Sequence, residues 1–211
     1  MPPTYFLTQR LPRYMTQTDV RAFFGVIGPL RDLALFCLTY QYGFRVSELA
    51  LLTRADVDLA RRRLTVKRAK GGIWTERPLF AGTARLLASY LAMYPAVVDA
   101  PLFPGRTGPL QKRQIQARFV RYRDCAGLDA RYTCHSLRHS IATHLLDAGA
   151  TLEFVQDHLG HRSIRSTSIY AQITDRHREA RFRELEASPW IVDPTRSPHV
   201  PPEEAPPCPA S

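Results

Sequence analysis

The stretch that decides the fold is residues 30–49, LRDLALFCLTYQYGFRVSEL. Its run Leu33-Ala34-Leu35-Phe36-Cys37-Leu38 is apolar on nearly every side of a helix, which is typical of a helix buried in the core. Pro29 opens this segment and Gly43 closes it, because glycine readily takes the left-handed conformation of a helix C-cap. We therefore predict a central helix from Leu30 to Tyr42.

An arginine follows this helix, between two predicted caps. Arg45 comes two positions after Gly43 and two before Ser47, which is expected to cap a short helix that runs through Leu52. Glu48 lies about one helical turn beyond Arg45 and is expected to hold its guanidinium in place. The pattern thus indicates a permanently charged side chain fixed at the junction of two helices.

Outside this stretch the periodicity changes from helix to strand and back. Residues 63–67 alternate as in a strand, Gly71-Gly72 marks a tight turn, and residues 73–79 form the predicted returning strand. Residues 57–59 are a candidate third strand. The predicted fold is mainly α with a small antiparallel β-sheet, an α+β class. Its other predicted helices are one capped by Thr16 or Thr18 and ending at Gly28, then residues 83–94, 111–126, 134–148, 151–159 and 175–187.

Composition divides the 211 residues into three parts. Residues 1–15 are an irregular lead-in, and residues 16–187 carry the periodic patterns of one substantial domain. Residues 188–211 hold eight of the seventeen prolines and hardly any periodic apolar residues. This last part is expected to be a disordered tail.

The charge balance favours a polyanionic partner. Twenty-nine Lys and Arg against nineteen Asp and Glu leave a net charge of +10, and nucleic acid is the first candidate for a partner. An anionic membrane surface is the second candidate, but no segment has the pattern of a basic amphipathic anchor. No run approaches the roughly 18 apolar residues that span a membrane. The four cysteines show no CxxC spacing, so we expect reduced thiols, as in the cytoplasm.

The strongest local signal is His135-Ser136-Leu137-Arg138-His139. On a helix, His135 and Arg138 share one face, and we expect both to point outward from a rigid support. The opposite, buried stripe is predicted to consist of Leu137, Ile141, Leu145 and Ala148. Gly149 ends this helix, Thr151 starts the next one, and Gly160 ends that one directly before His161.

Taken together, these motifs resemble the tyrosine recombinase, or phage integrase, family. The resemblance rests on Gly43-Phe44-Arg45-Val46-Ser47-Glu48-Leu49, the His135-x-x-Arg138 pair, Leu159-Gly160-His161, and Tyr170 nine positions after His161. Lys70-Gly71-Gly72, before Arg77-Pro78-Leu79, is similar to the hairpin lysine of that family. The match runs in order from about Thr16 to Asp175.

The resemblance implies a role for each of six residues. Tyr170 would attack the DNA backbone and form a 3′-phosphotyrosine link. Arg45 and Arg138 would clamp the two non-bridging oxygens, a task suited to guanidinium forks. His135 would accept a proton or bond the same phosphate, His161 would donate a hydrogen bond to it, and Lys70 would protonate the leaving 5′ oxygen. Ester exchange conserves the bond energy, so the resemblance implies neither metal nor ATP, and no cofactor is expected.

Three other readings compete with this one. His135 and His139 have the spacing of two zinc ligands, which His158 and His161 could complete, but the Glu of HExxH is absent and Arg138 would put a cation beside the metal. A DNA-binding regulator could use the fold without cutting. A type IB topoisomerase would share the phosphotyrosine chemistry.

Within the recombinase reading one assignment has an alternative: Lys67 competes with Lys70 for the role of general acid.

The chain departs from the family in having no room before Arg45 for the helical DNA-clamp domain that most members carry. The minimal fimbrial phase-variation recombinases are the most similar type, and a piece cut from a longer protein is the alternative. Basic side chains could replace the clamp by gripping phosphates, with residues 111–123 as the candidate groove contact. By resemblance, the partners are double-stranded DNA and further copies of the chain, in a tetramer on two recombining sites. The candidate DNA contacts are Arg61, Arg62, Arg63, Lys67, Arg68, Lys112, Arg113, Arg118, Arg121 and Arg123.

Overall fold

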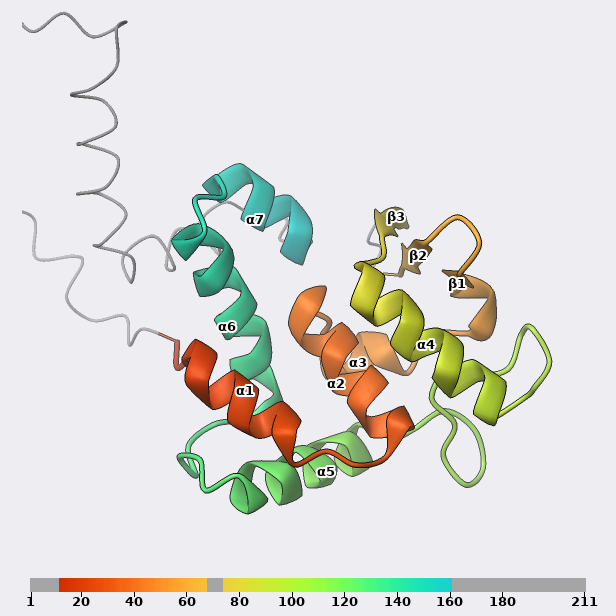
Figure 1. Cartoon of the computed structure of the whole chain (residues 1–211), viewed down its shortest axis with the longest axis horizontal. Coiled ribbons are helices and arrows are strands. Elements are labelled where there is room, and N and C mark those ends of the chain that lie inside the picture. Colours follow the sequence, from red (N-terminus) through yellow and green to blue (C-terminus); the bar gives the residue numbers. More distant parts are fainter. Residues whose placement is uncertain (1–11, 68–73, 161–211) are drawn as a thin grey trace, which may run out of the picture. The chain divides into compact units, whose positions relative to one another are not determined.

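Helix α2 (Leu30–Gln41) lies between α4 (Ala81–Met93) and α6 (Cys134–Asp147) and forms the centre of the domain, as its apolar run predicts (Figure 1). The structure is a computed structural model that describes residues 12–67 and 74–160. Side chains from successive turns of α2 are buried, among them Leu35, Phe36 and Leu38 with no exposed surface. The predicted central, buried helix is therefore confirmed.

The other helices agree with the predicted segments to within three residues at most ends. The first begins where Thr16 caps it: the Thr16 hydroxyl accepts from the Asp19 N–H at 3.1 Å, and the Asp19 carboxylate accepts from the Thr16 N–H at 3.0 Å. These helices are α1 (Gln17–Gly25), α3 (Val46–Leu49), α4 (Ala81–Met93), α5 (Lys112–Cys125), α6 (Cys134–Asp147) and α7 (Leu152–Leu159).

The prediction for α3 was wrong in its cap and its end. Arg45, not Ser47, is the N-cap residue, and the helix ends at Leu49 rather than Leu52. The reason is that the buried Glu48 carboxylate accepts a hydrogen bond from the Arg45 N–H at 2.9 Å, which satisfies a donor at the helix start. Ser47 is exposed within the helix.

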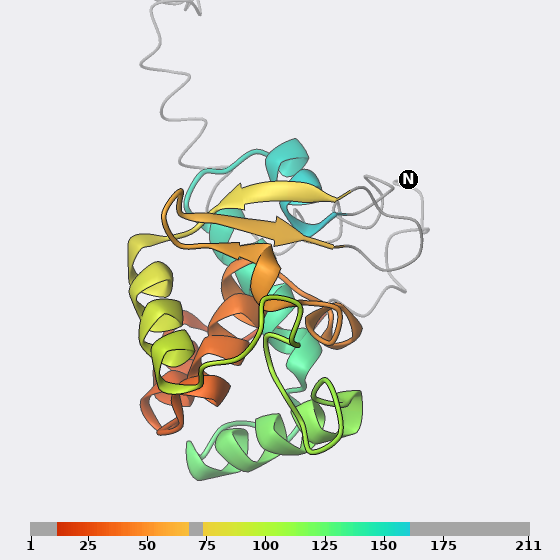
Figure 2. The same cartoon turned by 90° about the vertical axis from the view of Figure 1, so that its right-hand side faces the viewer.

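Three short antiparallel strands form the predicted sheet, in the order β1-β2-β3 (Figure 2). They are β1 (Val57–Asp58), β2 (Arg63–Val66) and β3 (Thr75–Pro78), and Leu64 of β2 pairs with Arg77 of β3. Leu64 and Val66 are buried while Arg63 is exposed, which confirms the alternation seen in the sequence. The predicted turn at Gly71-Gly72 lies outside the described residues.

The core consists of two apolar clusters of unequal size. The larger one joins α1, α2, α5 and the sheet, with the rings of Phe23, Phe36 and Phe119 within 5.0–6.1 Å of each other. The smaller one holds α7 against α6 through Ile141, Ala142, Leu146, Val155 and Leu159. The position of α7 therefore depends on few apolar contacts, and hydrogen bonds at its last turn contribute more to holding it in place.

The expected helix over residues 175–187, the lead-in up to residue 11 and the Pro-rich tail lie outside the described residues. Within the described part, no helix combines the length and apolar character needed to cross a membrane.

Candidate active site

Three segments meet at Gly43: the end of α2, the middle of α6 and the last turn of α7. Gly43 has a φ of +59°, a left-handed conformation that glycine adopts without strain. A Cβ atom at this position would overlap the Leu159 side chain and lie 3.7 Å from Arg138 Cγ. Position 43 therefore needs glycine both for the backbone turn and for the close approach of α7.

Arg138 fastens these segments together. It is 2% exposed, and its Nη1 donates to the Gly43 carbonyl while its Nη2 donates to the Leu159 carbonyl at 2.9 Å. Both carbonyls stand at helix ends, where they have no partner within the helix. The expectation that Arg138 points outward was wrong, because the buried guanidinium binds the ends of two neighbouring helices.

The buried stripe of α6 is confirmed only in part. Leu137 and Ile141 are buried and Leu145 is partly buried. Ala148 is exposed, because α6 ends at Asp147 and the chain turns away there.

Arg45 and Glu48 form the ion pair that their spacing suggested. Arg45 Nη1 lies 2.9 Å from Glu48 Oε1; the Arg45 side chain is 36% exposed and that of Glu48 is fully buried. A carboxylate with no exposure holds its partner more firmly than a surface carboxylate would. The buried Glu48 carboxylate thus orients the Arg45 guanidinium, which stays accessible from the solvent.

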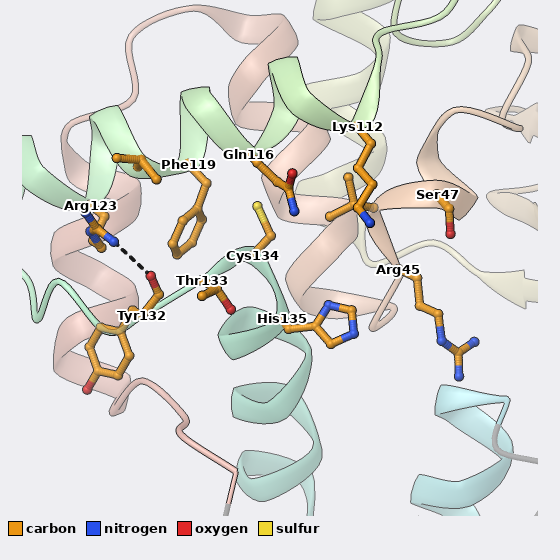
Figure 3. A pocket seen from close by; sticks show the side chains of 12 residues that line it. Arg45, Ser47, Lys112, Gln116, Phe119, Arg123, Tyr132, Thr133, Cys134 and His135 are labelled. Atoms are coloured by element: carbon orange, nitrogen blue, oxygen red, sulfur yellow. Dashed lines mark hydrogen bonds between the residues drawn. The ribbon is translucent and has the colours of Figure 1, made fainter.

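A cavity of about 560 Å³ opens beside Arg45, between α3, α5 and the start of α6 (Figure 3). Arg45, Lys112 and His135 bring nitrogen-bearing side chains to it from three different helices, whereas Phe119 and Val120 give it an apolar wall. The full lining is Arg45, Val46, Ser47, Lys112, Gln116, Phe119, Val120, Arg123, Tyr132, Thr133, Cys134 and His135. Such a combination suits an anion attached to an apolar body.

His135 is exposed in the first turn of α6. The pKa of His135 is below its ordinary value, first because the surrounding protein partly removes water from the ring, and then because of the positive charges of Arg138, Arg45 and Lys112. One turn further on, the His139 ring stands edge-on to it with centroids 5.9 Å apart. Burial, followed by His135 and Arg138, lowers the pKa of His139 to about 4. Both imidazoles are neutral at pH 7, so His135 can accept a proton there.

Three predicted catalytic residues, Lys70, His161 and Tyr170, and the predicted DNA contact Arg68 lie outside the described residues. The structure does describe the chain up to Gly160, which ends α7 in the left-handed conformation with a φ of 65°. His158 turns toward α2, where its Nε2–H donates to the Gln41 carbonyl at 2.7 Å. In the described ranges, no three His, Cys, Asp or Glu side chains gather as a metal site would require.

The predicted DNA contacts fall into two groups. One group is engaged in internal bonds: Lys67 lies 2.9 Å from Asp56, Arg118 lies 3.3 Å from Asp32, and Arg123 donates to the Tyr132 carbonyl at 3.1 Å. The other group is exposed and consists of Arg61, Arg62, Arg63, Lys112, Arg113 and Arg121. The sequence did not distinguish the two groups, and it did not indicate that Lys112 lies beside Arg45 and His135.

Residues 13–177 match the phage integrase family. The tyrosine recombinase XerA of Thermococcus onnurineus is 35% identical over 175 residues, which cover 79% of this chain and 60% of that protein. The tyrosine recombinase XerC of Rhodospirillum centenum is 39% identical over 151 residues, which cover 70% of this chain and 44% of that protein. The chain thus spans about half the length of these curated relatives.

Two solved structures have the same fold. A crystal structure of XerA recombinase matches with a TM-score of 0.73 and 26% identity, over 83% of this chain and 66% of that one. XerH site-specific recombinase bound to difH substrate, in a pre-cleavage complex, matches with a TM-score of 0.69 and 26% identity, over 87% of this chain and 56% of that one. The mainly helical architecture with a small antiparallel sheet is therefore that of a tyrosine recombinase catalytic domain.

Proposed function

Because the chain belongs to the phage integrase family, we propose that residues 16–187 are the catalytic domain of a site-specific DNA recombinase with Tyr170 as nucleophile. The observation that supports this most is the pair of hydrogen bonds that Arg138 donates to the Gly43 and Leu159 carbonyls. Gly43 lies two positions before Arg45, and Leu159 lies two positions before His161. One buried side chain thus ties together the segment before Arg45, the helix that carries His135 and the helix that ends before His161.

The proposed reaction is an exchange of one phosphate ester for another. The Tyr170 hydroxyl oxygen attacks phosphorus, its proton passes to His135 or to water, and a 3′-phosphotyrosine bond forms. The bond from phosphorus to the 5′ oxygen breaks, and that oxygen takes a proton from Lys70. Arg45 and Arg138 stabilise the charge on the two non-bridging oxygens, and His161 donates a hydrogen bond to one of them. For this role the Arg138 guanidinium, which is 2% exposed here, must turn toward the phosphate when DNA binds. Rejoining is the reverse reaction with another 5′ hydroxyl, so the exchange needs neither metal nor ATP.

The proposed partners are double-stranded DNA and further copies of the chain, assembled as a tetramer on paired sites in the cytoplasm. The net charge of +10 and the exposed basic side chains of α5 support the DNA partner. Residues 192–211, within the Pro-rich tail, are proposed to be dispensable for folding of the domain, so that a chain ending at Ile191 should keep its melting temperature.

Covalent trapping tests the function. A nicked duplex that loses its 5′ end after cleavage should leave a protein–DNA complex that survives denaturant. Tyr170→Phe should abolish this complex and keep non-covalent DNA binding, whereas Tyr94→Phe, at a half-exposed tyrosine of the α4 end, should form it normally. An adduct with Tyr170→Phe would assign another nucleophile. Relaxation of supercoiled DNA without exchange between two sites would favour a type IB topoisomerase, and the absence of any adduct would favour a DNA-binding regulator.

A sulfur-substituted substrate tests the general acid. An alkoxide is a very poor leaving group, since its conjugate acid is about as weak as water with a pKa of roughly 15.7, whereas a thiol has a pKa of about 8.5 and its thiolate leaves unaided. Lys70→Ala should therefore be nearly inactive on normal DNA and active when sulfur replaces the bridging 5′ oxygen. Lys67 is already held by Asp56 at 2.9 Å and lies 5.0 Å from the Trp74 ring centroid, which favours Lys70. Sulfur rescue of Lys67→Ala alone would reverse this assignment.

A further inference from the structure

Arg77, in the middle of β3, joins the small sheet to the last turn of α7. Its Nη1 donates to Asp157 Oδ2 at 2.6 Å, and its Nη2 donates to the Asp157 carbonyl at 2.8 Å. The Arg77 side chain is 16% exposed and that of Asp157 is 67% exposed. Two parallel bonds from one planar guanidinium fix orientation as well as distance. Figure 2 shows α7 beside β3, where these bonds form.

The two sides of this link lead to two proposed active-site residues. Strand β3 follows the segment that contains Lys70, and Arg77 is fixed within the sheet because it pairs with the fully buried Leu64 of β2. Asp157 belongs to the last turn of α7, which leads directly to His161. The Arg77–Asp157 link therefore sets the position of the strand after Lys70 relative to the helix before His161.

Helix α7 does not need Arg77 for its own position. Arg138 binds the Leu159 carbonyl, His158 binds the Gln41 carbonyl, and the smaller apolar cluster packs α7 on α6. That cluster contains no residue of the sheet among those the structure describes. If Arg77 is removed, we expect α7 to keep its place and the sheet to lose a polar link to it.

The Arg77 side chain is also poorly arranged for stability alone. Its Nε is buried and has no hydrogen-bond partner within the described part of the chain. A buried donor without a partner destabilises the folded protein, because it loses its hydrogen bond to water. The side chain thus keeps a costly orientation in which both Nη atoms meet Asp157, and this favours a role in positioning.

We propose that Arg77 is a positioning residue for the reaction: by binding Asp157 it fixes β3, the strand that follows Lys70 in the sequence, against the helix that precedes His161, and proton transfer to the leaving 5′ oxygen depends on this link. This inference rests on the proposed function. Arg77 itself touches neither the phosphate nor the reacting atoms. Its loss removes proton delivery and leaves the nucleophile and the phosphate clamp in place.

The test compares normal DNA with the sulfur-substituted substrate in single-turnover cleavage at saturating protein. Arg77→Ala should slow cleavage of normal DNA at least tenfold, and sulfur should restore its rate to within about threefold of the wild-type rate on the same substrate. DNA affinity should change less than twofold. Glu76→Ala, at the exposed neighbour on β3, is the matched control and should cleave both substrates normally. Arg77→Lys should recover part of the rate, since an ammonium can reach Asp157 but cannot bind it twice.

A double-mutant cycle checks that Asp157 is the partner. Arg77→Ala/Asp157→Ala should be no slower than Arg77→Ala, and additive losses would contradict the link. An Arg77→Ala protein that cleaves normal DNA at the wild-type rate, or one that sulfur does not rescue, overturns the proposal.

The same experiment separates this inference from the proposed function. If the wild-type protein forms no adduct, the function is wrong. If it forms one and sulfur rescues Lys70→Ala but not Arg77→Ala, only the positioning role is wrong.

Discussion

Two regions of the molecule are built in opposite ways. One is the Gly43 junction, which consists of Gly43, Arg138 and Leu159. The other is the basic face of α5, which consists of Lys112, Arg113 and Arg121. At the junction a buried guanidinium binds two backbone carbonyls beside a glycine that has no room for a methyl group. On α5 the three side chains are exposed to solvent. The proposed reaction needs atoms fixed to a fraction of an ångström, whereas attraction to a polyanion needs only charge near a surface. Substitutions should therefore be costly at the junction and mild on α5.

The largest effect is expected from the two arginines. Arg45→Lys and Arg138→Lys should each slow cleavage by about 10²–10³-fold, the usual loss for one donor to a developing oxyanion. Only Arg138→Lys should also lower the melting temperature, because an ammonium leaves one of two buried carbonyls poorly paired, at about 1–3 kcal/mol. Single-turnover cleavage and thermal unfolding measure the two losses. Normal cleavage by either variant would remove that arginine from the site.

Gly43→Ala should destabilise the protein by about 3 kcal/mol, since it combines a left-handed backbone with overpacking against Leu159. Gly127→Ala is the matched control: Gly127 has a φ of +63°, but a Cβ there meets nothing within 4 Å. Denaturant unfolding of both variants isolates the cost of the overlap. Equal losses would mean that α7 does not press on Gly43 as described.

Acid should destabilise the folded protein through His139, which follows Arg138 of the junction in α6. Its pKa is about 4 in the folded protein against about 6.5 when unfolded, so protons bind the unfolded chain more readily. This contribution to stability is complete above about pH 6.5 and is lost as the pH falls toward 4. Between pH 7 and 5 we expect a loss of about 1–2 kcal/mol that His139→Gln does not show. Parallel pH profiles of the two melting temperatures would contradict this.

The smallest effects are expected on α5. Arg113→Ala and Arg121→Ala should each weaken DNA binding several-fold and reduce the slope of log affinity against log salt by about 0.9. Arg85→Ala, at an exposed position on α4, is the matched control and should leave the slope unchanged. Binding titrations at several salt concentrations measure both quantities. An unchanged slope for the α5 variants would place DNA on another face.

The part of the site that the sequence predicted follows from local rules. The apolar run of α2, the left-handed Gly43 and the i, i+3 spacing of Arg45 and Glu48 involve neighbours within one or two turns, and each is confirmed, although the C-cap residue of α2 is Tyr42 rather than Gly43. The inward turn of Arg138 was missed because its acceptors lie 95 and 21 positions away. Periodicity shows which face of a helix a residue occupies, but it does not show which carbonyls from distant parts of the sequence lie next to that face. The roles of Lys70, His161 and Tyr170 remain predictions that rest on the family resemblance.

The long sequence separations at the junction imply an order of assembly. The bond from His158 to Gln41 spans 117 positions and that from Arg138 to Gly43 spans 95, so each closes a large loop of chain. Closing such loops costs entropy before any contact compensates for it, and contacts of this kind form late in folding. During synthesis α5 also leaves the ribosome before α7. We therefore expect a nascent chain to be able to hold DNA before it can cut it, which would make strand breakage a property of the finished fold alone.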